Sequence, residues 1–388
     1  MQQPASAAVD AAQGLRELIW ANRDRTEERR QLADPVVDAL VDSGLGRLAL
    51  ANVHGGLELP PTEALEVLET LAAAEAAVAW IVWNSSLPCW LGRFLGDDAR
   101  NEIFSDRRAL FASSTRPSGK AVRDGDAYIV NGRWSLVSGC LHAAWIPVMC
   151  IVEKDGETEM LAPNRPHMRM LYVPRDAFTI HDTWYVGGLK GTGSHDVELR
   201  DQRVPALRSF AMGDLPQIDS AFGRMPIVPV MAAGGASICL GIADAALRAL
   251  LELASGKASI DGGPGLKDRP PVQALVAELD TRLQAIRLRL RACCERAWQS
   301  ALDGTPRNLD ESAALFGAAI VAAEESRDGV NRIYAAAGAS SLYTASPIER
   351  AHRDIHAVCQ HIVLQPFWLE QAGRVRLGLE PTHPMFML

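Results

Sequence analysis

Apolar and charged positions alternate with a helical period over the first part of the chain. Between residues 8 and 44, apolar residues recur every three or four positions, which predicts helix. The Pro-Pro-Thr run at 60–62 ends one segment and can start another, after which apolar positions continue from 65 to 83. We therefore expect an all-helical first region, with one long helix after residue 61, that ends near Ser105.

After residue 105 the pattern changes to short runs of β-forming residues. Glycine, aspartate, asparagine and proline separate these runs, and some of the runs alternate between apolar and polar positions. This texture is typical of a small antiparallel sheet. The predicted strands cover residues 109–113, 128–137, 145–152, 160–162, 168–173 and 197–199.

The helical period then returns in four long blocks, at residues 227–254, 270–303, 309–338 and 347–365. Glycine and proline separate the blocks, and a four-helix bundle buries four such blocks most simply. We predict a mainly α fold with a central β domain. Its parts are an N-terminal helical domain (1–108), a middle antiparallel β domain (109–222) and a C-terminal four-helix bundle (223–388). A ligand would bind in the cleft where the sheet meets the bundle.

Composition and charge exclude several classes of protein. The 388 residues include 39 basic and 47 acidic ones, a formal net charge of −8, and 48% are hydrophobic. That apolar content excludes a disordered chain, and the lack of Lys/Arg runs argues against nucleic acid or a membrane surface as partner. Two uncharged stretches, 76–92 and 225–243, approach membrane-spanning length but contain proline and polar or glycine residues. We interpret them as buried helices.

The cysteines indicate a reducing compartment. There are seven of them, an odd number without CxxC spacing, and their neighbours are mostly apolar. Such residues are typical of reduced, buried thiols in a cytoplasmic protein. The first residues lack the basic start and apolar core of a signal peptide, so we expect a cytoplasmic location.

The segment with the most chemical content lies at residues 132–145. A strand ends in Ser138 and Gly139, a turn follows, and a second strand begins at Trp145. A hydroxyl and an amide at the end of a strand can bind a planar ligand, but they also form an ordinary hairpin turn. On local evidence alone the hairpin is the simpler interpretation.

Several segments resemble, in order and in spacing, the acyl-CoA dehydrogenase superfamily. Within it the chain is similar to the two-component, group D flavin monooxygenases, a group with the oxygenase components of hydroxyphenylacetate and steroid-phenol hydroxylases, dibenzothiophene monooxygenase and amino-sugar N-oxygenases. The matching segments are ANVHGGLE (51–58), RPSGKA (116–121), GRWSLVSGCLHAAW (132–145), GLKGTGSHDV (188–197), AGAS (337–340), RAHRDIH (350–356) and QH (360–361).

The resemblance implies a flavin site around Ser138. Ser138 would lie beside the N5 edge of the isoalloxazine ring, with backbone contacts from Gly139 and with Trp145 nearby. The loop that carries Gly191 and Thr192 would close over flavin and substrate. In a homo-oligomer, expected to be a tetramer, residues of the bundle would approach the flavin across a subunit interface: Gly338, Ala339 and Ser340.

The same resemblance implies the reaction. A separate NAD(P)H:flavin reductase would supply reduced FMN or FAD, and dioxygen would react with it to give a C4a-hydroperoxide. That species would oxidise a small molecule in a pocket from which water is kept out. The lack of a GxGxxG motif after a strand fits a chain that has no nicotinamide site of its own.

Three histidines near the C-terminus have different expected roles. His352 and His356 are four residues apart on one helical face, whereas His361 points elsewhere, just before Pro366. An HxxxH pair can bind a metal, but no glutamate lies between the two and no third ligand is evident, so we predict no metal site. We interpret His352 and His356 as structural. The resemblance implies that His361 is a catalytic acid or base.

Two other functions stay open at this point. An acyl-CoA dehydrogenase or oxidase with FAD would place a glutamate after the last bundle helix, but no carboxylate lies between Asp354 and Glu370. The other position that such enzymes use corresponds to Lys257 and Ala258. A non-catalytic binding or scaffold subunit would keep the fold without flavin affinity.

The substrate class is only partly indicated. Phenol-hydroxylating relatives carry a histidine at the position of Pro88, so a phenol is in doubt, and an aromatic or polycyclic compound or an amine remains. The residues that would line its pocket are Trp83, Ser86, Trp90 and Trp184.

Overall fold

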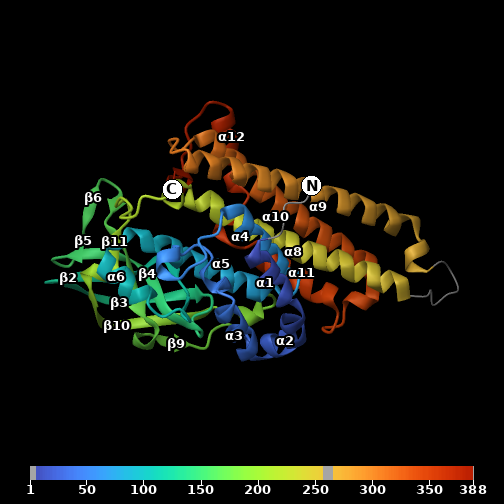
Figure 1. Ribbon diagram of the computed structural model, residues 1–388, viewed down its shortest axis with the longest axis horizontal. Coiled ribbons are helices and arrows are strands. Elements are labelled where there is room, and N and C mark those ends of the chain that lie inside the picture. The colour runs from blue at the N-terminus through green and yellow to red at the C-terminus, as the bar shows by residue number, and fades with distance from the viewer. Residues whose placement is uncertain (1–5, 257–264, 388) are drawn as a thin grey trace.

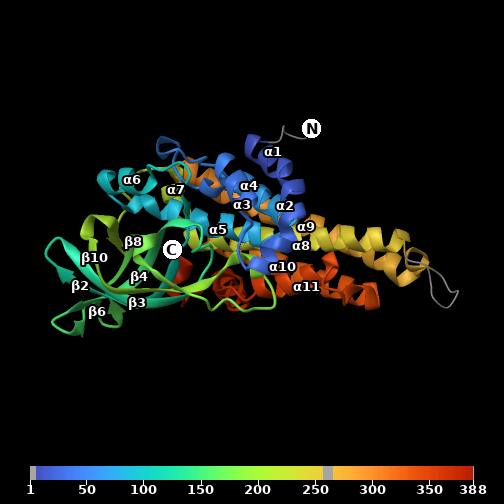
Figure 2. The same cartoon turned by 90° about the horizontal axis from the view of Figure 1, so that it is seen from below.

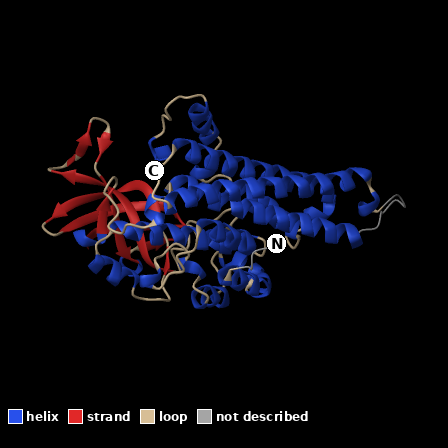
Figure 3. Ribbon diagram, turned by 45° about the horizontal axis from the view of Figure 1, so that its top comes forward, coloured by secondary structure: helices blue, strands red, loops and turns tan. Residues whose placement is uncertain are grey.

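The computed structural model describes residues 6–256 and 265–387. The molecule is elongated, with the β-sheet at one end and long helices extending away from it (Figure 1). Coloured by secondary structure, the strands form one compact group and the helices cover one side of it and continue beyond it (Figure 3). The expected class, mainly helical with a central sheet, is confirmed.

Short helices form the N-terminal region. They are α1 (Ala7–Gly14), α2 (Arg16–Arg29), α3 (Asp34–Asp42), α4 (Pro61–Ala72), α5 (Ala76–Leu91) and α6 (Asp97–Phe104).

The single long helix expected after residue 61 is wrong, because α4 and α5 are separate helices. Glu75 between them has an extended backbone (φ −160°), and its carboxylate accepts a hydrogen bond from the Ala77 amide, 3.4 Å away. Glu75 is therefore the N-cap of α5, and its extended backbone interrupts the helix between α4 and α5.

The sheet is mixed rather than antiparallel. Its main order is β11-β8-β4-β2-β3-β10-β9, and β2 pairs with β4 in parallel. The predictions missed β2, since most of its side chains are polar and exposed. The strands are β1 (Leu110–Phe111), β2 (Ser114–Asp124), β3 (Ala127–Val137), β4 (Ala143–Lys154), β5 (Glu157–Thr158), β6 (Met160–Ala162), β7 (Arg165–Pro166), β8 (Met168–Pro174), β9 (Thr179–His181), β10 (His195–Pro205) and β11 (Ser209–Ala211).

The hairpin interpretation of residues 132–145 is also wrong. β3 and β4 lie on opposite sides of β2, so they are not neighbours in the sheet. The segment 138–142 is therefore a connection that crosses over the end of β2. It places Ser138 just after the end of β3, where Trp80 of α5 bonds to it. α5 lies between the strands and α8 (Figure 2).

The C-terminal helices are α7 (Ala221–Arg224), α8 (Ile227–Gly256), α9 (Pro270–Leu302), α10 (Leu309–Ala337), α11 (Pro347–Val358) and α12 (Phe367–Arg376). The last predicted block, 347–365, is too long: α11 ends at Val358, and a turn with the 3-10 helix η9 (Ile362–Leu364) follows. The predicted break at 262–265 falls mostly on residues outside the described ones, as do Lys257 and Ala258.

α8 is the central helix of this region. In the described part of the chain it alone has the length and composition that could cross a membrane, but 83% of its most apolar window is buried inside the protein. It packs against α4, α5, α10 and α11. The expectation of a buried core helix for this stretch is met.

The helices of the N-terminal region and of the bundle share one apolar core, and the sheet has a second core of its own. The boundary at 108/109 falls between α6 and β1, whereas 222/223 falls inside α7. We keep the three regions as a proposal for how the chain divides. All seven cysteines are free and buried, as predicted.

Candidate functional site

Ser138 stands at one end of a chain of hydrogen bonds between side chains. Its side chain is buried, and its hydroxyl accepts a hydrogen bond from Trp80 Nε1 at 2.9 Å. The Ser138 and Ser194 hydroxyl oxygens are 2.7 Å apart, as are those of Ser194 and Thr192. The Thr192 hydroxyl donates to the Leu189 carbonyl at 2.8 Å.

The last of these bonds gives the chain a direction. Because the Leu189 carbonyl can only accept, Thr192 uses its hydrogen there, Ser194 then donates to Thr192, and Ser138 donates to Ser194. Ser138 has accepted one hydrogen bond, from Trp80, and an oxygen of this type can accept a second. The site therefore presents an acceptor to a ligand that carries an N–H group.

His361 belongs to the same cluster. It follows α11 rather than lying on it, and its ring packs edge-on against Trp80 and Trp83, with ring centres 5.5 and 4.9 Å away. The Val363 amide donates to His361 Nδ1 at 3.4 Å, so the hydrogen of the neutral ring resides on Nε2. Burial, with a smaller contribution from the charge of Arg116, lowers the pKa of His361 to about 4.

Trp80 joins the two predicted catalytic residues, since its indole bonds to Ser138 and its ring contacts His361. No role for Trp80 was predicted from the sequence. Its place in an uncharged helical stretch was the only signal, and a tryptophan there is equally expected in a core. Only the position of α5 beside the end of β3 brings its indole between Ser138 and His361.

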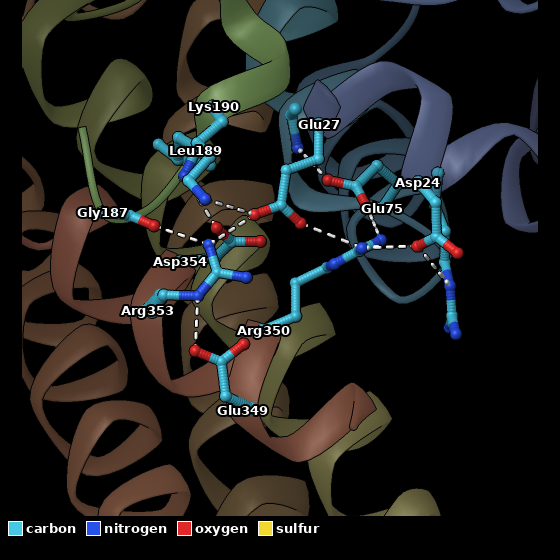
Figure 4. A network of polar contacts seen from close by, with 12 residues as sticks. Asp24, Glu27, Glu75, Gly187, Leu189, Lys190, Glu349, Arg350, Arg353 and Asp354 are labelled. Atoms are coloured by element: carbon cyan, nitrogen blue, oxygen red, sulfur yellow. Dashed lines mark hydrogen bonds and ion pairs between the residues drawn. The ribbon is translucent and has the colours of Figure 1, made fainter. Parts of the chain in front are cut away.

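A network of charged side chains holds the loop that ends this chain of hydrogen bonds (Figure 4). Asp354 of α11 accepts from the Leu189 amide at 2.7 Å, where Leu189 has a left-handed backbone (φ 53°). Glu27 of α2 lies 2.9 Å from Lys190 of the loop and 2.8 Å from Arg353. The loop is thus tied to α2 on one side and to α11 on the other.

Buried acids form part of this network. Arg350 bridges Glu27 and Glu75, at 2.9 and 3.3 Å. Burial raises the pKa of Glu75 to about 8, and it raises the pKa of Asp354 to about 6. Carboxylates with raised pKa values often mark functional sites, but these two bind protein groups: Asp354 the Leu189 amide, and Glu75 the Arg350 guanidinium. We assign them to the positioning of the loop.

Gly191 lets the loop approach α2 and α5. A Cβ atom at this position would lie 2.3 Å from Thr26 Cγ2 and 3.1 Å from Ala77 Cβ. We expect Gly191→Ala to lower the free energy of unfolding by about 1–3 kcal/mol, measured by urea denaturation. Gly187→Ala is the matched control, because a Cβ there meets nothing within 4 Å. Equal effects of the two substitutions would contradict the packing argument.

The neutral state of the half-buried His361 predicts a pH effect on stability. Its pKa falls from 6.5 to about 4 on folding, so below pH 6.5 the unfolded chain binds a proton that the folded protein does not. From pH 7 to pH 5 the wild type should therefore lose about 1–2 kcal/mol more unfolding free energy than His361→Gln. Parallel urea titrations at the two pH values measure this. Equal losses in both proteins would show that His361 titrates normally.

The other predicted site residues are only partly brought together. Trp83 contacts His361, and Trp184 donates to the Leu189 carbonyl at 3.2 Å. Trp90 instead donates to the Phe222 carbonyl, Ser86 bonds back to its own helix, and Trp145 packs under Arg208. Gly139 uses its amide to bond the Thr192 carbonyl, so this amide holds the loop rather than a ligand.

Gly338, Ala339 and Ser340 do not meet Ser138 within one chain. They form the 3-10 turn at the end of α10, which contacts α10 and α11. Gly338 and Ala339 are exposed, and a Cβ at Gly338 would meet nothing within 4 Å. A role of these residues at a flavin needs a second subunit and stays a proposal.

The residues around Ser138 fit the ring of a flavin. Four groups lie together near the end of β3: a hydroxyl oxygen that can still accept a hydrogen bond, two indole rings and a neutral imidazole. They provide the hydrogen-bond acceptor and the apolar surfaces that a reduced isoalloxazine ring requires, and all four groups are uncharged. These residues would contact the ring of the flavin and not its ribityl or phosphate part.

The chain is similar in sequence and in structure to known proteins. Residues 233–366 match the family described as Acyl-CoA dehydrogenase, C-terminal domain. Over 97% of its length the chain is 29% identical to the indole-3-acetate monooxygenase of Pseudomonas putida, covering 96% of that protein. It is 28% identical to the flavin-dependent monooxygenase, oxygenase subunit HsaA, of Mycobacterium tuberculosis, with coverage of 99% and 98%. The solved structure of XiaF from Streptomyces sp. with FADH2 and glycerol superposes with a TM-score of 0.89 at 25% identity, over 97% and 96% of the two chains.

Proposed function

Since the chain belongs to the acyl-CoA dehydrogenase superfamily, among its flavin-dependent monooxygenases, we propose that it hydroxylates an aromatic small molecule with reduced flavin and dioxygen. When bound, the reduced flavin supplies the electrons that activate oxygen. One oxygen atom enters the substrate and the other leaves as water. The protein's own residues bind and orient the two molecules, exclude water and manage a proton.

The observation that carries the proposal is the cluster of Trp80, Ser138 and His361. The Ser138 oxygen can accept a hydrogen bond, and the N5 atom of a reduced flavin carries a hydrogen that an oxidised flavin lacks. The directed chain from Ser138 to Leu189 therefore favours the reduced cofactor. His361, with its hydrogen on Nε2, can donate to an oxygen atom beside the ring.

The same geometry argues against an acyl-CoA dehydrogenase. That reaction begins with the removal of a proton by a carboxylate beside the flavin. The turn after α11 carries His361 instead, and Asp354, the nearest acid before it, is bound to the Leu189 amide. We accordingly assign oxygenation rather than dehydrogenation to the site.

A separate flavin reductase is the partner that this function requires. The chain resembles a flavin-dependent oxygenase subunit over nearly its whole length, and we propose that it receives its flavin already reduced. Further parts of the proposal are a homotetramer, in which the turn Gly338–Ser341 lies at an interface, and a cytoplasmic location, which suits the buried free thiols. The experiment below compares FMN with FAD as the cofactor.

The proposal is tested by mixing the protein anaerobically with reduced FMN or reduced FAD and then adding oxygen. The bound flavin should reoxidise more slowly than free flavin and show a transient near-ultraviolet absorbance band. The preferred flavin is the one that gives the longer-lived band. If oxidised flavin and peroxide form as fast as in free solution with both cofactors, the chain does not control the oxygen reaction and the proposal is wrong.

A further inference from the structure

Arg93 is a buried cation whose hydrogen-bonding groups are only partly used. It lies in the 3-10 helix η3 (Gly92–Phe94) after α5, and only 5% of its surface is exposed. Nη1 donates to the Phe222 carbonyl, whereas Nε and Nη2 have no hydrogen-bond partner among the described residues. Because a guanidinium keeps its proton in proteins, these donors remain charged and unsatisfied.

No acid compensates this charge within the described part of the chain. None of the ion pairs among these residues involves Arg93, and burial together with the nearby charge of Arg307 lowers the pKa of Arg93 to about 9. An unpaired buried charge is strongly unfavourable, so proteins rarely keep one without a role. The side chain has two aromatic neighbours, Trp90 and Phe94, with its guanidinium carbon 5.0 and 5.3 Å from their ring centres.

The unsatisfied guanidinium lines a small cavity of about 30 Å³. Arg100 and His54 also line it, and Arg100 Nε is a second buried donor without a partner. Glu58 is the one acid in the lining, and its carboxylate accepts from the Asn52 amide at 3.0 Å. The cavity can hold one small group such as a carboxylate, but not a ring. Its walls are apolar and aromatic where Trp90 and Phe222 contribute.

We propose that this cavity, the Arg93 pocket, binds a small oxyanion, and that the anion is the carboxylate of an aromatic acid substrate. The source of the anion rests on the proposed function. A carboxylate would fill the two open donor positions of a planar guanidinium, a geometry that arginine accommodates well. Nothing in the described chain competes for them.

The position of the pocket along α5 supports the substrate as source. Trp83, which contacts His361, and Trp90, which contacts Arg93, are seven residues apart and therefore on one face of the helix. Two helical turns separate them by about 10 Å. An aromatic acid with a short side chain has dimensions of this order. The pocket would thus set which end of the substrate faces His361.

The experiment measures binding of three probes to the full-length protein by calorimetry, without oxygen. The probes are indole-3-acetate, its neutral amide and inorganic phosphate. The wild type should bind the acid at least about tenfold more tightly than the amide. Arg93→Gln should abolish that preference and Arg93→Lys should retain part of it. Arg203→Gln is the control, since Arg203 pairs with Asp124 and Asp126 on the exposed face of the sheet.

Thermal unfolding of the wild type gives a second measurement that needs no variant. The acid should raise the melting temperature more than the amide does. Equal affinity of the wild type for acid and amide, or an unchanged preference in Arg93→Gln, would overturn the proposal. Phosphate that binds as tightly as the acid and displaces it would show a free-anion site and overturn the substrate assignment. The oxygen reaction of the wild type with reduced flavin tests the proposed function separately.

Discussion

His361→Gln is expected to lower the rate of substrate hydroxylation by about 100-fold or more, the usual loss when a positioned acid or base is removed. His361 Nε2 carries the hydrogen of the neutral ring, and the ring is held between Trp80, Trp83 and the Val363 amide. Glutamine keeps similar bulk but exchanges protons far less readily. Single-turnover assays with reduced flavin, oxygen and indole-3-acetate as probe substrate measure the product formed per enzyme.

The matched control is His356→Gln, on the last turn of α11. His356 Nε2 is 2.9 Å from the Asn331 side-chain oxygen, so this ring is engaged within the bundle, away from the Trp80 cluster. It should retain most of the hydroxylation rate. Similar hydroxylation rates for both variants, whether high or low, would contradict a specific role of His361 as acid or base.

Ser138→Ala is expected to raise the fraction of consumed oxygen that is released as peroxide, with about a tenfold faster loss of activated oxygen. One hydrogen bond to a buried polar partner accounts for a change of this size. The substitution removes the acceptor that the site offers to N5 and leaves Trp80 Nε1 without a partner. Peroxide yield and product yield per oxygen, measured together, give the coupling ratio.

Ser326→Ala serves as control for the loss of a buried hydroxyl. Ser326 is fully buried in α10, and its hydroxyl has no partner in the described chain. Its removal should leave the coupling ratio unchanged. An unchanged ratio in Ser138→Ala as well would mean that the hydroxyl does not act on the flavin.

Much of the helical architecture could be predicted from periodicity, and the errors fall where local pattern is not decisive. The break at Glu75 depends on a side-chain cap. The helix α11 ends at Val358, eight residues before Pro366, whereas the predicted block continued to residue 365. The segment after β3 looks like a hairpin because a hairpin and a crossover share the same local turn residues. Only the strand order, with β2 between β3 and β4, distinguishes them.

The candidate site also contains residues that could be predicted from the sequence and residues that could not. Ser138 and His361 were found because they lie in segments that resemble a known family, and the structure places both against Trp80. Trp145 was expected near them and packs under Arg208 instead, and Trp90 lies two helical turns beyond Trp83, beside Arg93. The sequence does not distinguish such positions, because a tryptophan in an apolar segment has the same pattern in a core as in a pocket. The Arg93 pocket had no signal in the sequence at all.

The order of helical and β regions, the buried state of the cysteines and the family could be predicted from the sequence, because periodicity, composition and segment order are properties of the chain alone. Which side chains meet depends on how the elements pack in three dimensions. Trp80, Ser138, Thr192 and His361 come from four segments far apart along the chain. Hydrogen bonds of 2.7 to 2.9 Å run from Trp80 through Ser138 and Ser194 to Thr192, and they require their elements to pack in one arrangement. The burial of an uncompensated charge at Arg93 is likewise a consequence of packing.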